Sequence, residues 1–215
     1  NINNNNPEPI KGTWDESKGL KPSIETYMHA ILPHRFVFHV HCLNTISWVV
    51  QSEFEKEVAN KFKNLKYTVI KYKKPGILLA NEIQNKLISF TPNIIFLSNH
   101  GLVVGFDSIK EVLDKLYFVS NHLKRKNKIN QDLNIQLLLE ISFNTIFRPS
   151  KYSQINQIAS NERNIKLVTS GSLFPDQVVF LGLDPFEVIK LENSNKIKTY
   201  SNSEKLPIII IPRVG

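Results

Sequence analysis

The chain has 215 residues, of which 41% are apolar and 21% are charged, with eight Gly and eleven Pro residues. This composition excludes a collagen-like chain and wholesale disorder, so we expect one globular domain or two small ones. The formal net charge is +8, but the lysines are spread over the whole chain rather than gathered in a stripe, so we expect no nucleic acid as partner. An anionic small substrate is compatible with this charge.

Membrane and secretory segments are not expected. No stretch approaches the roughly 18–20 uninterrupted apolar residues of a membrane helix, and the start, Asn1 to Asn6, lacks the features of a signal peptide. The single cysteine, Cys42, excludes an internal disulfide and a cysteine-based zinc finger. A cytoplasmic protein without a membrane partner is therefore expected.

The first half of the chain predicts a mixture of helices and strands. Residues 1–20 are polar and interrupted by Pro and Gly, which indicates an irregular lead-in. A helix is predicted over 24–32, with Ser23 as its N-cap and Pro33 at its end. Four elements follow, a strand, an amphipathic helix, a second strand and a helix: 36–41, 53–65, 67–72 and 77–89.

The second half begins with two strands, over 94–97 and 102–104. Ser108 and Glu111 form a capping box that predicts the start of a long helix. Further helices are predicted at about 133–147 and 153–160, and short strands at 178–181, 187–191, 196–200 and 208–211. Together these elements predict an α/β layered fold with a β-rich C-terminal part from about residue 165.

Three histidines form the candidate metal site. Residues i and i+2 of a strand share a face, so His39 and His41 project to one side about 7 Å apart, from which two imidazoles can converge on one ion. Two surface histidines are the alternative interpretation of this spacing. His100 follows a buried strand and precedes Gly101, whose missing side chain lets backbone approach a ligand. Three neutral imidazoles with an open position are typical of catalytic zinc.

Glu25 is the candidate acid–base residue. A carboxylate in the first turn of a helix is favoured by the helix dipole, which is a sufficient structural explanation for it. However, Glu25 lies just before the histidine strand, and the short connection Pro33-His34-Arg35 would fold the helix start back across the sheet. We interpret His29 and His34 as structural and His122 as a surface residue.

These residues stand in motifs that resemble the class II aldolase/adducin family. The motifs are Pro-Ser-Ile-Glu-Thr over 22–26, the His-Val-His of 39–41, and Asn-His-Gly-Leu over 99–102 followed by a hydrophobic strand. Leu-Pro-His-Arg over 32–35, the Pro75-Gly76 pair and Gly-Ser-Leu-Phe-Pro-Asp over 171–176 further resemble the rhamnulose-phosphate-aldolase-like region that many bacteria fuse to a short-chain dehydrogenase. The resemblance runs from about residue 9 onward and predicts one aldolase-like domain over 21–215.

The resemblance implies a three-layer α/β/α fold around a largely antiparallel sheet, commonly assembled as a homotetramer. It implies that Zn²⁺ or another divalent metal is bound by His39, His41 and His100, and that Glu25 is the catalytic acid/base. Substrate-binding residues by the same resemblance are Ser23, Asn99 and Gly101, with Ser23 on the substrate phosphate.

The implied activity is that of a zinc-dependent aldolase, a lyase of carbohydrate metabolism that cleaves or forms a C–C bond in a phosphorylated ketose such as rhamnulose 1-phosphate. A sugar-phosphate epimerase of the same family and a non-catalytic adducin-like module are the alternatives. Retention of Glu25 and the three histidines argues against the module, whereas a Gly-Asn-x-Ser phosphate loop missing from 1–20 argues for it. The missing loop leads us to expect either a trimmed piece of a longer protein or a short variant of the family. The sequence also lacks the dinucleotide-binding motif G-x-G-x-x-G, so NAD chemistry is not expected.

Overall fold

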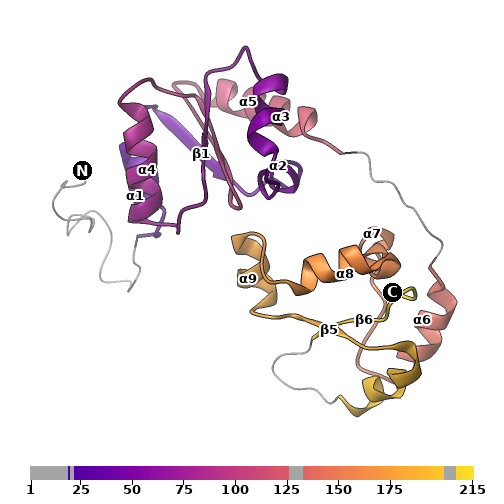
Figure 1. Cartoon of the computed structure of the whole chain (residues 1–215). Helices are drawn as coiled ribbons and strands as arrows, with labels where there is room; N and C mark the ends of the chain where they lie inside the picture. Colours follow the sequence, from indigo (N-terminus) through magenta and orange to yellow (C-terminus); the bar gives the residue numbers. More distant parts are fainter. Residues whose placement is uncertain (1–18, 20–21, 126–132, 201–206) are drawn as a thin grey trace. The chain divides into compact units, whose positions relative to one another are not determined.

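A computed structural model describes residue 19 and residues 22–125, 133–200 and 207–215 (Figure 1). The chain divides into two units, one ending at Arg125 and the other beginning at Lys126. Apart from Gly19, the predicted lead-in over 1–20 lies outside the described residues. Among the described helices, none has the length and apolar character required to span a bilayer.

A four-stranded sheet organises the first unit. Its strands are β1 (Phe36–Val40), β2 (Tyr67–Ile70), β3 (Ile94–Leu97) and β4 (Gly101–Phe106), in the order β1-β4-β3-β2. The central strand β4 is antiparallel to both β1 and β3, and β2 is parallel to β3. Two of the three pairings are thus antiparallel, as the resemblance implied.

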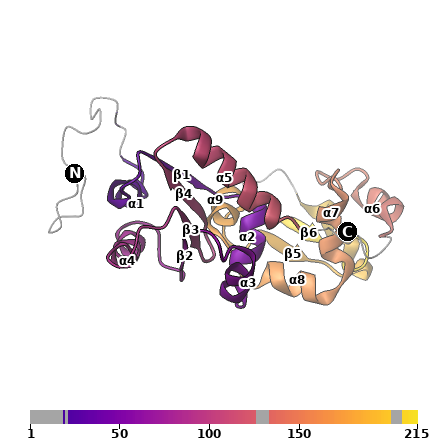
Figure 2. The ribbon, with the colours of Figure 1, turned by 90° about the horizontal axis from the view of Figure 1, so that it is seen from above.

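Alternating side chains of the strands create two cores, one on each face of the sheet. Phe96, Leu102 and Val104 pack on one face against α2 (Leu43–Val49), α3 (Phe54–Lys61) and α5 (Ile109–His122). Ile95, Leu97 and Val103 pack on the other face against α1 (Thr26–Ile31) and α4 (Ile77–Leu87). Figures 1 and 2 show these two helix groups on opposite sides of the sheet. The predicted α/β/α layering is confirmed.

The second unit combines short helices with a small parallel sheet. Its elements are α6 (Ile135–Ser142), α7 (Ser153–Asn156), the 3₁₀ helix η2 (Gln157–Ser160), α8 (Glu162–Thr169), α9 (Pro175–Leu181), β5 (Phe186–Val188), the 3₁₀ helix η3 (Leu191–Thr199) and β6 (Ile208–Ile210). β5 and β6 pair with each other. Ile189, Ile197, Ile211 and Val214 form the core of this unit.

Two predicted strands and the β-rich character from about residue 165 are wrong. Residues 178–181 belong to α9, where Pro175 at the helix start and Asp176 in the first turn outweigh the strand preference of Val-Val-Phe-Leu. Most of 196–200 belongs to η3, in which Ile197 is buried between exposed lysines. A single buried residue between exposed lysines fits a strand, but it also fits a 3₁₀ helix, which has three residues per turn.

Helix boundaries also differ from the sequence-based expectations. α2 and α8 were not predicted, and α6 is shorter than the expected helix over 133–147. α1 has Glu25 rather than Ser23 at its N-cap position, because Ser23 instead initiates the preceding turn with its carbonyl oxygen bonded to the Thr26 amide at 3.0 Å. Ser108 does occupy the N-cap of α5, but its side chain makes no capping hydrogen bond.

Candidate metal centre

The antiparallel pairing of β1 and β4 brings the candidate ligands together. Val40, the last residue of β1, pairs with Leu102 near the start of β4. His41 directly follows β1, and His100 directly precedes β4, so this register places them side by side. His39 pairs with Val103, which packs on the face covered by α1. Glu25 stands at the N-cap of that helix and contacts His39 and His100 where β1 ends and β4 begins.

The four side chains converge as the sequence predicted. One potential ligand atom from each of Glu25, His39, His41 and His100 lies within 4.8 Å of the others. The imidazole centroids are 4.8 Å apart for His39–His41 and His39–His100, and 5.0 Å apart for His41–His100. This donor set of three imidazoles and a carboxylate suits a divalent transition metal.

Glu25 connects two of the histidines. His39 Nδ1 donates to Glu25 Oε2 at 2.8 Å, and His100 Nε2 donates to Glu25 Oε1 at 3.1 Å, because an ionised carboxylate can only accept. In neutral imidazoles this leaves a lone pair on His39 Nε2 and on His100 Nδ1. Both atoms are buried and have no hydrogen-bond partner among the described residues. Two orphaned ring nitrogens in one cluster fit a metal ion as the missing partner.

The protonation states of the cluster favour ligand binding. Hydrogen bonds from His100 and then His39 lower the pKa of Glu25 well below its usual value, although burial opposes this shift. Burial lowers the pKa of His39, and the neighbouring Glu25 carboxylate offsets only part of that effect. At neutral pH, Glu25 is therefore ionised and His39 is neutral, which is the form of imidazole that binds a metal.

Gly101 is required by the close approach of the two strand ends. A Cβ at this position would lie 2.7 Å from the Val40 carbonyl oxygen, 3.0 Å from His41 Cδ2 and 3.3 Å from His39 Nε2. The sequence-based expectation that backbone approaches a site at Gly101 agrees with this geometry. Its role in binding substrate stays a prediction.

The remaining predicted site residues lie beside the cluster. Ser23 Oγ accepts a hydrogen bond from the Glu25 amide at 3.2 Å, so Ser23 is adjacent to the carboxylate in the turn before α1. Asn99 precedes His100 and has a φ of 55°, in the left-handed region that asparagine tolerates. Its backbone N–H donates to the Val49 carbonyl oxygen at 3.1 Å. Contacts of Ser23 and Asn99 with a substrate stay predictions.

Two of the other three histidines make hydrogen bonds to backbone carbonyl oxygens. His34 Nε2 donates to the Pro92 carbonyl oxygen at 3.0 Å, and His122 Nδ1 donates to the Phe118 carbonyl oxygen at 2.8 Å on the surface of α5. His29 lies in the last turn of α1. These positions agree with the interpretation of His34 as structural and His122 as a surface residue.

Comparison with known proteins identifies the family. The model of the "Class II Aldolase and Adducin N-terminal domain" matches residues 2–125, more than half of the chain. The chain belongs to the class II aldolase/adducin family. The matched region contains Glu25 and all three histidines of the cluster. The closer resemblance to the rhamnulose-phosphate-aldolase-like region stays a prediction.

Individual relatives of this class II aldolase-family chain are distant or match only in part. The "Uncharacterized oxidoreductase YuxG" of Bacillus subtilis is 27% identical over 120 residues, which are 54% of this chain and 17% of that protein. The N-terminal class II aldolase domain of a conserved Thermoplasma acidophilum protein is 30% identical, with a TM-score of 0.43 over 48% of this chain and 47% of that chain. YgbL of Escherichia coli, described as a putative aldolase/epimerase/decarboxylase, is 18% identical, with a TM-score of 0.39 over 64% of this chain and 65% of that chain.

Proposed function

We propose that the protein is a metal-dependent aldolase, a lyase that cleaves or forms a C–C bond in a phosphorylated ketose of the rhamnulose 1-phosphate type. The observation that carries this proposal is the Glu25 carboxylate, held by His39 at 2.8 Å and by His100 at 3.1 Å beside two orphaned imidazole nitrogens. A scaffold module has no need for buried imidazoles without partners, since each costs about 1–3 kcal/mol of stability. The cluster therefore favours a catalytic protein over an interaction module.

The metal would be held by His39, His41 and His100, and Zn²⁺ suits three imidazoles with an open position. A divalent ion bound there supplies Lewis-acid polarisation of the substrate's carbonyl and adjacent hydroxyl oxygens. The residues of the chain supply the rest. Ser23, Asn99 and Gly101 surround the cluster and are proposed to position the substrate.

Glu25 is proposed to carry the proton to and from the reacting carbon. As an ionised carboxylate it can accept a proton, and its low pKa depends on the two hydrogen bonds from His100 and His39. Loss of either bond raises that pKa, toward the range in which a carboxylate exchanges protons efficiently near neutral pH. Substrate-dependent rearrangement of these bonds would thus turn a structural carboxylate into a general base.

Two attributes of the protein are part of the same proposal. A homo-oligomer, with a tetramer as the family's common form, and a cytoplasmic location rest on the resemblance and on the single cysteine. Sedimentation of the purified chain measures the first of them directly.

The activity is tested by pairing metal analysis with product analysis. Purified protein should retain a stoichiometric divalent metal and release an aldehyde and dihydroxyacetone phosphate from rhamnulose 1-phosphate or a related ketose phosphate. His39→Ala should lose both metal and activity, whereas His122→Ala, which removes an exposed histidine outside the cluster, should lose neither. Isomerised sugar phosphate without released aldehyde would indicate the epimerase, and a protein that binds no metal would refute the enzyme proposal.

A further inference from the structure

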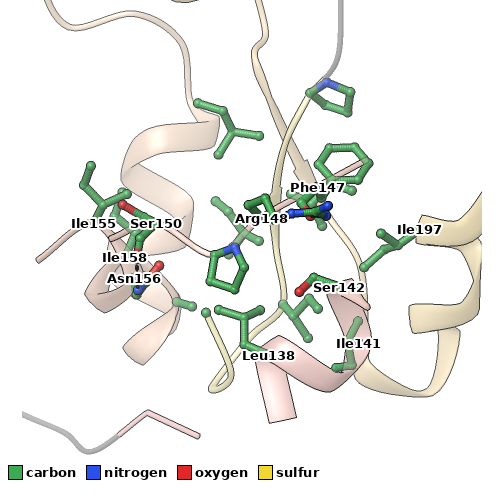
Figure 3. Close-up of a pocket in the computed structure, with 18 of the residues that line it drawn as sticks. Leu138, Ile141, Ser142, Phe147, Arg148, Ser150, Ile155, Asn156, Ile158 and Ile197 are labelled. Carbon is green, nitrogen blue, oxygen red and sulfur yellow. Dashed lines mark hydrogen bonds between the residues drawn. The ribbon is translucent and has the colours of Figure 1, made fainter. Parts of the chain in front are cut away.

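The second unit contains a pocket that is separate in sequence from the metal centre. The pocket has a volume of about 520 Å³ and is lined by residues between 138 and 215. Figure 3 shows Leu138 and Ile141 of α6, Ile155 and Ile158 of α7 and η2, and Ile197 of η3 around it. Pockets of about 300–1,000 Å³ with mostly apolar walls are typical of small-molecule sites. The body of a ligand that fits here is apolar.

One strong positive charge stands on the wall of this apolar pocket. Arg148 lines it, as Figure 3 shows, and its Nη1 donates to the carbonyl oxygens of Thr145 and Phe147, both at 2.6 Å. Both bonds are made by Nη1, so they orient the guanidinium through one of its three nitrogens. Arg148 is exposed, both of its side-chain hydrogen bonds within the described part of the chain use Nη1, and none of the ion pairs there includes it. The edge that remains is the planar fork that binds a carboxylate through two parallel hydrogen bonds.

The other polar side chains of the pocket are Ser142, Ser150 and Asn156, and Ser150 Oγ accepts a hydrogen bond from the Tyr152 amide at 3.2 Å. Asn156 Nδ2 donates to the Ser150 carbonyl oxygen at 3.0 Å, and Ser142 Oγ donates to the Leu139 carbonyl oxygen at 3.1 Å. These groups add no charge and compete little for a ligand. The pocket therefore combines one available cation with apolar walls, which complements a ligand that has one anionic end and an apolar remainder.

We propose that this pocket binds an amphiphilic monocarboxylate, an apolar chain or ring that ends in a carboxylate. The apolar part packs against the isoleucines, and the carboxylate binds the Nε–Nη2 edge of Arg148. This site is a second ligand site of the protein, and it uses none of the residues of the metal centre.

Titration of the full chain with dodecanoate, below its micelle concentration, tests the proposal by calorimetry. We expect saturable binding of one molecule per chain, and weaker binding of dodecanol, which has the same tail without the charge. Arg148→Gln should weaken dodecanoate binding about tenfold or more, the loss of one charge-assisted contact, and should leave dodecanol binding within about twofold. The matched control is Arg163→Gln, which removes an exposed arginine of α8 outside the pocket lining and should change neither affinity.

A second variant keeps the test decisive if Arg148→Gln does not fold. Ile208 lines the pocket at the start of β6 and is 38% exposed, so Ile208→Trp fills the pocket from its accessible side and should abolish binding of both ligands. Non-saturable dodecanoate binding, equal losses in Arg148→Gln and Arg163→Gln, or unchanged affinity in Ile208→Trp would each overturn the proposal. These outcomes do not depend on whether the metal centre is active.

Discussion

Glu25 is the residue on which the proposed mechanism depends, and its helix position alone does not explain its contacts. A carboxylate at a helix start gains about 0.3–1 kcal/mol from the dipole. Here both carboxylate oxygens instead accept hydrogen bonds from imidazoles, one in β1 and one directly before β4. A residue placed only to stabilise α1 would face the free amides of its own first turn, so these contacts support the proposal that Glu25 has a further role.

Replacing Glu25 separates its two roles. The Glu25→Gln amide has one acceptor oxygen for two imidazole donors and cannot act as a base, so turnover should fall about 10²–10⁴-fold. The free energy of unfolding should fall by only about 1–3 kcal/mol, because one buried imidazole donor loses its acceptor. Turnover is measured with metal content checked, beside Glu111→Gln, which removes a first-turn glutamate of α5 instead. Turnover of Glu25→Gln within about threefold of wild type would remove Glu25 from the mechanism.

Gly101 gives a second test at the level of one residue. A methyl group 2.7 Å from the Val40 carbonyl oxygen and 3.3 Å from His39 Nε2 must push the two strand ends apart. Gly101→Ala should therefore weaken zinc binding by about 10–100-fold, comparable to the loss of a supporting contact in other metal sites. Zinc affinity is measured by competition with a chelator.

The matched control for Gly101→Ala is in the same strand. A Cβ at Gly105 would meet the His34 ring, away from the cluster, so Gly105→Ala should cost about 1–3 kcal/mol of stability by overpacking yet keep its zinc affinity. Equal zinc loss in both variants would mean that strand β4 as a whole, and not the approach at Gly101, sets the geometry of the centre.

At the scale of elements, the sequence predicts correctly those helices and strands whose apolar residues follow a single helical or strand periodicity. His39 and His41 could be assigned to one strand face because the i, i+2 spacing is a property of every strand. Their contact with His100 follows from the antiparallel pairing of β1 with β4, which no local pattern encodes. The wrongly predicted strands at 178–181 and 196–200 are short apolar segments in which helix-start chemistry or a three-residue turn competes with strand preference.

Helix α1 is short, and its packing must hold Glu25 in place. It has six residues, and Met28, 1% exposed, anchors it in the core that α4 and the sheet share. Met28→Ala should cost about 2–5 kcal/mol in urea unfolding, whereas Leu78→Ala should stay within about 0.5 kcal/mol. The control residue is on α4 and is 56% exposed.

The same variant addresses the function of α1. Because α1 carries Glu25 but none of the three histidines, Met28→Ala should lower turnover more than it lowers zinc affinity. The reverse order would show that α1 supports the histidines rather than the carboxylate.

At the scale of the whole molecule, the family match and the division of the chain coincide. The family model covers residues 2–125, and the first unit ends at Arg125. The second unit has its own core and its own pocket. That the aldolase-like domain extends over 21–215 stays a prediction, and the chain spans 17% of the length of its curated relative YuxG. The net charge of +8 is compatible with an anionic substrate but locates no site for it, because net charge describes the whole surface.

This division predicts where metal binding stabilises the protein. A ligand that binds only the folded state adds about 2.7 kcal/mol at a hundredfold excess over its Kd, and the added stability belongs to the cooperative unit that contains the site. All four cluster residues lie between 25 and 100, within the first unit. Zinc should therefore slow amide hydrogen exchange in the sheet strands β1, β3 and β4, and leave the core amides around Ile189 and Ile211 unchanged. Mass spectrometry of peptic fragments, with zinc and then with a chelator, measures both regions in one sample, with His39→Ala as the control that should show no zinc effect. Equal protection of both units would mean that they unfold as one cooperative body, and protection of neither would remove the metal from the four-residue cluster.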